Sequence, residues 1–166
     1  SAKGNACCVA GIIGEVQQAT LNNVYNTGSV TGFAYVGGLI GFIFTSATVQ
    51  NSYSSGAING NDAPTTGALI GEPYDSATIT LLNNYWNNQT SLQTTACGTT
   101  NPCDEGTFSI TSAQMRTQST YADTWDFTED WGICEYFNNG FPYLLWQNPT
   151  CTPATPGLPN TSLRSH

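Results

Sequence analysis

Three copies of one short pattern recur nearly in phase along this chain, and they restrict its fold more than any other feature. The pattern is an apolar stretch closed by glycine, namely AGIIG at residues 10–14, GGLIG at 37–41 and GALIG at 67–71. A polar and aromatic segment follows each copy: NVYNTG at residues 23–28, NSYSSG at 51–56 and NNYWNN at 83–88. The closing glycines are spaced by 27 and then 30 residues. Repetition at this period is typical of stacked supersecondary units.

The second repeat, residues 36–66, shows what one unit contains. Its apolar and β-branched residues predict short strands over residues 36–44, 47–53 and 57–59, with Gly- and Ser-rich turns between them. Three strands in about 30 residues fit one coil of a β-solenoid. We therefore predict an all-β fold: a short right-handed β-solenoid (β-helix) of about three coils, with an aromatic, disulfide-stapled C-terminal cap that contains a short helix.

Stacked coils place like residues above one another at about the 4.8 Å spacing of strands. The predicted ladders are aliphatic, aromatic and amide: Ile13, Ile40 and Ile70; Tyr25, Tyr53 and Tyr85; Asn23, Asn51 and Asn83. The first two ladders bury area, and an asparagine ladder forms hydrogen bonds along the stack. For the tyrosines, an exposed binding stripe is the alternative to burial.

The GGLIG and NSYSSG segments together resemble the GLUG motif repeat, which occurs in large secreted bacterial adhesins and near some immunoglobulin A proteases. The resemblance covers about residues 10–90, and the second unit matches best. Ala10 replaces the leading glycine of the first unit, and Ala68 replaces the second glycine of the third. Asn87 and Asn88 stand where Ser-Gly is expected. The resemblance implies a secreted or cell-surface β-helical stalk, and it supplies no catalytic residues.

The chain divides into three parts on this interpretation: repeats over residues 1–92, a disulfide loop and cap over 93–147, and a Pro/Thr-rich tail over 148–166. Thr111 and Gln114 form a capping-box pattern that predicts a helix over about 112–119. The ring-rich segment that follows is expected to cover the open end of the stack, where backbone groups and apolar area need a partner.

Six cysteines indicate disulfides. We predict the pairs Cys97–Cys103 and Cys134–Cys151, hence an oxidising compartment, with reduced buried thiols as the alternative. For the adjacent Cys7 and Cys8, the sequence allows two states, a covalent link to a partner or a buried free thiol. A zinc site is disfavoured because the single histidine is the terminal His166.

Composition excludes several classes of partner. Only 8% of the residues are charged and the net charge is −8, so the chain lacks the basic surface that nucleic acid or an anionic membrane requires. No apolar run reaches the ~18 residues of a membrane span. The absence of a visible signal peptide is expected for a processed chain or an excised fragment of a secreted or cell-surface protein. Asn88 and Asn160 begin N-glycosylation sequons, and their modification is left open.

No constellation predicts catalysis, a cofactor or a metal. Asp104 and Glu105 are candidate calcium ligands, but a solvated turn is favoured because a spaced ligand set is missing. Five carboxylates cluster in the cap without any pattern that places two of them face to face: Asp123, Asp126, Glu129, Asp130 and Glu135. We expect no enzyme here, and a glycan-active enzyme is the most distant alternative.

The favoured function is a structural and adhesive extracellular unit. Its N-terminal edge is expected to meet further repeats or another copy of the chain, head to tail in a surface fibre or within a longer adhesin stalk. The second hypothesis is a glycan-binding module that stacks sugars of host or environmental glycans on exposed Trp86 or Tyr74.

Overall fold

The computed structural model describes residues 2–3, 7–98, 103, 105–121, 123–149 and 151. This part of the chain is mostly β, with strands that pair mainly in parallel and one α-helix, α1 (Ser112–Met115). Most of the predicted tail at 148–166 lies outside the described residues, as do Asp104 and Asn160.

Each repeat contributes a similar series of strands. The first contains β2 (Val9–Ala10), β3 (Ile13–Asn22), β4 (Tyr25–Asn26) and β5 (Val30–Gly32). The second contains β6 (Val36–Gly37), β7 (Ile40–Gln50), β8 (Tyr53–Ser54) and β9 (Ile58–Gly60). The third contains β10 (Thr66–Gly67), β11 (Ile70–Pro73), β12 (Thr78–Leu82) and β13 (Asn84–Asn87), preceded by the 3-10 turn η1 (Ala63–Thr65). The predicted single strand over residues 36–44 is therefore two strands, β6 and β7.

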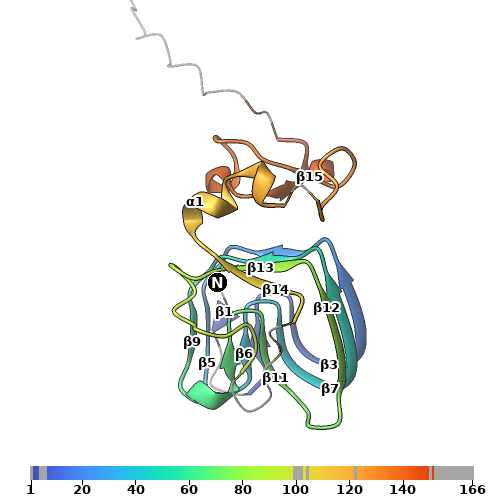
Figure 1. Ribbon diagram of the computed structural model, residues 1–166. Helices are drawn as coiled ribbons and strands as arrows, with labels where there is room; N and C mark the ends of the chain where they lie inside the picture. Colours follow the sequence, from blue (N-terminus) through green and yellow to red (C-terminus); the bar gives the residue numbers. More distant parts are fainter. Residues whose placement is uncertain are drawn as a thin grey trace, which may run out of the picture.

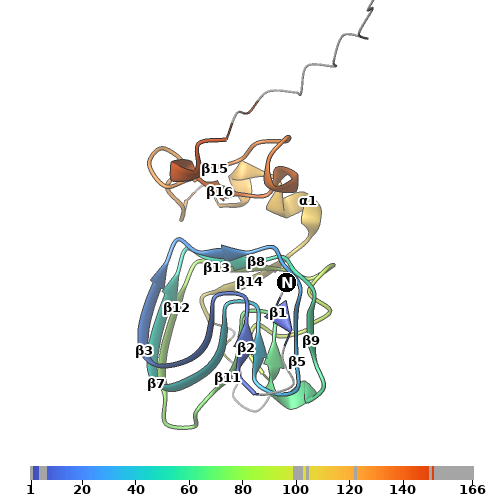
Figure 2. The same ribbon diagram turned by 180° about the vertical axis from the view of Figure 1, so that it is seen from behind.

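Equivalent strands of successive repeats pair in parallel, so that each repeat forms one level of a stack (Figures 1 and 2). The strand orders are β10-β6-β2, β14-β13-β8-β4 and β1-β5-β9, with β1 at Ala2–Lys3 and β14 at Thr107–Ile110. In the largest sheet, β7 pairs with β3 on one side and with β11 and β12 on the other. No sheet closes on itself among the described strands.

The register follows the spacing of the repeats. Ile40 pairs with Ile13 and Ile70 in the neighbouring levels. Tyr53 pairs in the same way with Tyr25 and Tyr85. These are the aliphatic and aromatic ladders that the sequence predicts.

The asparagine positions lie at corners of the stack. Asn23, Asn51 and Asn83 follow β3, β7 and β12, which pair in one sheet, and have positive φ angles of 54°, 49° and 55°. Asparagine adopts this left-handed conformation more readily than most residues, so the chain turns there into the next sheet. The Asn83 amide also donates a hydrogen bond to Asn51 Oδ1 at 3.4 Å.

Glycine is required where adjacent levels approach closely. A Cβ atom at Gly41 would collide with the carbonyl oxygen of Gly14 in the preceding level and would lie 2.8 Å from the carbonyl oxygen of Tyr35. The closing glycine of the repeat therefore permits the backbones to stack.

Aliphatic side chains fill the space between the sheets. This core includes fully buried Leu39, Ile40, Ile43 and Ile70, and Trp86 packs into it from β13. Tyr85, the preceding residue, belongs to a different cluster on the outer face of the same strand. This division follows from the alternation of side chains along a strand.

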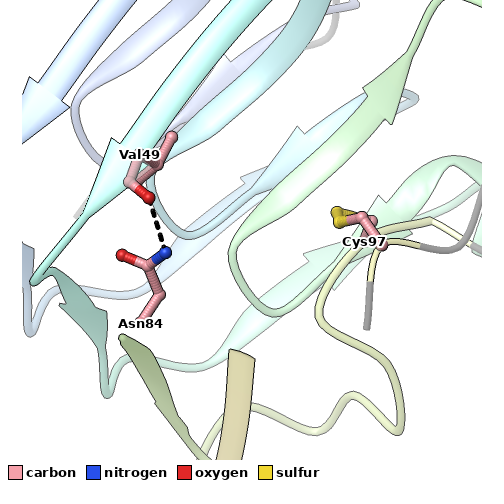
Figure 3. Close-up of a disulfide and its surroundings, with 4 residues drawn as sticks. Val49, Asn84 and Cys97 are labelled. Carbon is pink, nitrogen blue, oxygen red and sulfur yellow. Dashed lines mark hydrogen bonds between the residues drawn. A yellow bond between two sulfur atoms is a disulfide. The ribbon is translucent and has the colours of Figure 1, made fainter. Parts of the chain in front are cut away.

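The stack continues beyond the third repeat. The backbone NH of Leu69 donates to Ala96 O at 2.8 Å, Cys97 forms a parallel bridge with Ile70, and β14 pairs with β13. Residues 95–98 and β14, which the sequence placed in a loop and a cap, thus form part of a fourth level. Figure 3 shows Cys97 beside this interior, with the Asn84 side chain donating to Val49 O at 2.7 Å nearby.

Both predicted disulfides are present. The Cα atoms of Cys97 and Cys103 lie 5.6 Å apart, and those of Cys134 and Cys151 lie 5.7 Å apart, within the usual range for this bond. Cys7 and Cys8 are free, with their sulfur atoms 2.8 Å apart. The disulfides indicate that the chain folds in an oxidising environment.

The C-terminal region, residues 111–149, contains α1, β15 (Trp131–Gly132), β16 (Tyr143–Leu144) and the 3-10 turns η2 (Gln118–Thr120), η3 (Asn138–Gly140) and η4 (Leu145–Gln147). The capping box of Thr111 and Gln114 is confirmed, but α1 ends at Met115 rather than near residue 119.

The C-terminal region lies across the outer face of the β14-β13-β8-β4 sheet, not over the end of the stack (Figures 1 and 2). The expectation of an end cap is therefore wrong. The aromatic residues of this region pack instead against Tyr25, Tyr53 and Tyr85, which form a tyrosine row on this face.

Candidate functional site

Two neighbouring features of the C-terminal region are the candidates for function: its contact with the tyrosine row and a groove beside that contact. The contact is the larger of the two. Tyr25 and Tyr53 stack with their ring centroids 5.2 Å apart and their planes 5° from parallel. Trp131, which is completely buried, packs against both rings at 6.1 and 6.0 Å.

Each hydroxyl of the tyrosine row has a partner in the C-terminal region. Tyr25 donates to Gln147 Oε1 at 2.9 Å, and Tyr53 donates to Pro142 O at 2.7 Å. The Tyr85 hydroxyl pairs with Thr124 Oγ1 at 3.1 Å. The row is thus satisfied and half-buried or buried, so it does not form the exposed stripe weighed as an alternative.

Two tryptophans connect the C-terminal region to the asparagine corners. Trp125 Nε1 donates to Asn83 O at 2.9 Å, and Trp131 Nε1 donates to Asn23 Oδ1 at 3.3 Å. Burial raises the pKa of the Tyr53 hydroxyl well above its usual value, and it raises that of Tyr121 as well. The raised pKa values keep both hydroxyls protonated where they are buried.

The groove lies between the repeat stack and the C-terminal region and has a volume of about 730 Å³. The repeat stack contributes the hydroxyl residues Thr27, Ser55 and Thr90 to its lining. The C-terminal region contributes a cation, Arg116, a carboxylate, Glu135, and the ring of Phe141. The guanidinium carbon of Arg116 lies 4.6 Å above the centroid of the Phe141 ring.

The two aromatic residues proposed to stack sugars have different environments. Trp86 is only 5% exposed and packs in the interior of the stack, so its expected exposure is wrong. The strand β13 turns Trp86 inward because it turns Tyr85 outward. Tyr74 is 54% exposed beyond the end of β11, where its backbone NH bonds Ile43 O.

One carboxylate of the C-terminal region, that of Asp126, is held by local hydrogen bonds. Asp126 accepts hydrogen bonds from the side chain and backbone of Thr128 and the backbone of Glu129, and these bonds lower its pKa. Within the described ranges, no three His, Cys, Asp or Glu side chains gather closely enough to hold a metal ion. Asn88, the first residue of a sequon, is exposed, and its amide donates to Ser109 Oγ at 3.1 Å.

Comparison with known proteins agrees with the repeat pattern. Residues 34–59 match the family described as the GLUG motif. The chain carries a GLUG motif. The matched residues run from just before β6 to β9, so one GLUG motif corresponds to one level of the stack.

A longer relative extends the similarity beyond this GLUG motif. Over 103 residues, 59% of this chain, the sequence is 37% identical to a protein of Evansella cellulosilytica named as a Gly-rich membrane protein. The chain spans about a tenth of the length of that relative, since the match covers 10% of it. No solved structure matches the chain. No helix in the part of the chain described here is long and apolar enough to cross a bilayer.

Sequence reasoning found the ladders and both disulfides but missed the groove. Ser55 lies within the NSYSSG segment, where it has no feature that separates it from the neighbouring serines. Ser55 lines the same groove as Arg116 and Glu135 because of where the C-terminal region docks. No repeat or spacing in the sequence encodes this position.

Proposed function

We propose that this chain is a structural, adhesive unit of a secreted or cell-surface protein, built as a short right-handed β-solenoid of GLUG-type levels. The observation that carries the proposal is the parallel pairing of equivalent strands, in which Ile13, Ile40 and Ile70 occupy successive levels. Such a stack grows by adding levels and creates length and a repeated lateral surface, as a stalk requires.

The two ends of the stack support head-to-tail growth. Strands β2 and β4 stand at the ends of their sheets, and β3 pairs only with β7 among the described strands. At the opposite end, Phe108 of β14 is 46% exposed and Leu92 is 67% exposed. Edge strands and exposed apolar side chains invite further pairing, and a contact between unlike ends propagates as a fibre. The same edges suit additional repeats in a longer parent chain.

The remaining parts of the proposal follow from the same features. The disulfides fit a secreted or cell-surface location. The proposal includes no catalytic activity. Binding of saccharides, the second function expected from the sequence, loses Trp86 as a stacking surface.

Electron microscopy at rising protein concentration tests the assembly. We expect filaments from the unmodified chain and their loss in Phe108→Glu, which places a charge at the exposed end. Tyr136→Glu is the matched control, because Tyr136 is 55% exposed but belongs to the C-terminal region. Discrete monomers at every concentration, or equal loss of filaments in both variants, would count against head-to-tail assembly.

A further inference from the structure

The groove beside the tyrosine row contains a buried hydroxyl without a partner. Ser55 lines the groove and is 6% exposed, and its Oγ forms no hydrogen bond with the described residues. Its carbonyl oxygen, in contrast, accepts a hydrogen bond from Thr90 Oγ1 at 2.6 Å. The Ser55 Oγ is enclosed by its neighbours, as is the unpartnered Ser54 Oγ beside it, so the hydroxyls that the groove opens to a ligand are those of the exposed Thr27 and Thr90.

A second hydroxyl lies beside Ser55 on the preceding level. Asn26 pairs with Ser54, and Thr27 and Ser55 follow these residues directly. The backbone NH of Ser55 donates to Asn26 O at 2.9 Å, which continues the parallel register to this point. Because the levels stack, hydroxyls from two adjacent levels line the groove, and each can donate and accept a hydrogen bond.

Arg116 is held in position on the opposite side of the groove. Its Nε donates to Asn139 O at 2.8 Å, its Nη1 donates to Ser112 O at 3.1 Å, and its guanidinium covers the Phe141 ring. Two of its nitrogens are thus engaged, and Nη2 forms no hydrogen bond within the described part of the chain. A guanidinium fixed in this way presents its remaining donors at low entropic cost.

The charges of the groove favour a neutral ligand. Arg116 only donates, the Glu135 carboxylate only accepts, and the hydroxyls of Thr27 and Thr90 do both. An anion would meet Glu135 and the net charge of −8, and a cation would meet Arg116. A polyol satisfies all of these groups together, since every hydroxyl both donates and accepts.

We propose that this groove is a binding site for a neutral saccharide unit. Its volume of about 730 Å³ falls within the range of small-ligand sites. Hydroxyls of the sugar bind Thr27, Arg116 and Glu135. The site is separate from the stack ends proposed for assembly, so either proposal can fail without the other.

The test is a titration of the full chain with neutral hexasaccharides of β-linked glucose and of mannose, followed by NMR and calorimetry. A hexasaccharide of galacturonic acid serves as the charged comparison. We expect saturable binding of a neutral probe, with the largest amide shifts at Ser55, Arg116 and Glu135. No saturable binding of either neutral probe at millimolar concentration, or tighter binding of the acidic probe, would overturn the proposal.

Glu135→Gln is the decisive variant because Glu135 is exposed, so its replacement is expected to leave the fold intact. Removing the charge from an accepting carboxylate is expected to weaken binding about tenfold. Glu129→Gln is the matched control, an exposed carboxylate of the C-terminal region that does not line the groove. Equal affinities of these two variants would contradict the assigned site, even if a saccharide binds elsewhere on the chain.

Discussion

Replacing Trp131 with alanine should remove the main contact that holds the C-terminal region on the stack. Trp131 is completely buried. The centroid of its ring lies 4.3 Å from that of Trp125 and 6.1 and 6.0 Å from those of Tyr25 and Tyr53. Core substitutions of this size cost about 3–5 kcal/mol. Aromatic pairs add about 0.5–1.5 kcal/mol beyond their buried area. We therefore expect Trp131→Ala to lower the free energy of unfolding by about 4 kcal/mol.

Urea unfolding followed by near-ultraviolet circular dichroism measures this loss. With an m value of about 2 kcal/mol per molar urea, the midpoint should fall by about 2 M. Trp146→Ala is the control, because Trp146 is 78% exposed in the same region and its loss should change stability by no more than about 0.5 kcal/mol. A loss below about 1 kcal/mol for Trp131→Ala, or equal losses in the two variants, would refute the packing described.

Three further predictions concern the corners, a disulfide and the buried tyrosines. Asn51→Ala should cost about 1–2 kcal/mol in thermal unfolding because φ is 49° there, whereas Asn51→Gly should cost much less; equal costs would contradict the corner role. Replacing Cys134 and Cys151 by alanine, which opens a loop of 17 residues, should cost about 3 kcal/mol, while Cys7→Ala should have little effect. Burial raises the pKa of Tyr53 and Tyr121 above their unfolded value near 10, so the folded chain keeps protons that the unfolded chain loses. Stability should therefore be full below pH 10 and fall as the pH rises further, and absorbance at alkaline pH should show these hydroxyls ionising only with unfolding; early ionisation of all tyrosines would contradict their burial.

The repeats made the register predictable because they encode it locally. A stack that places Ile13, Ile40 and Ile70 in one row needs only their equivalent positions in each repeat, and these can be counted in the sequence. The same spacing aligned Asn23, Asn51 and Asn83, although it did not show that these residues lie at corners of the stack in a left-handed backbone conformation.

The direction of the side chains was harder to predict than the register. Tyr85 and Trp86 are adjacent aromatic residues on a strand of four residues, so alternation alone left open which one faces the interior. The tyrosine row faces outward because the C-terminal region covers it, and that region contains no repeat to indicate where it docks. Its aromatic content showed that it is buried, but not against which surface.

The groove depended on this same docking and so escaped prediction. Ser55, Arg116 and Glu135 are far apart in the sequence and show no motif spacing. Their proximity follows from contacts such as that of Tyr53 with Pro142, which no local pattern reveals.

Proton contacts of Ile40, measured by NMR on isotopically labelled chain, test the central claim most directly. Parallel stacking in register predicts backbone nuclear Overhauser effects from Ile40 to the strand segment around Ile13 and, on its other side, to the segment around Ile70. Effects to only one of these segments, or to neither, would contradict the ordered levels on which the proposed stalk depends.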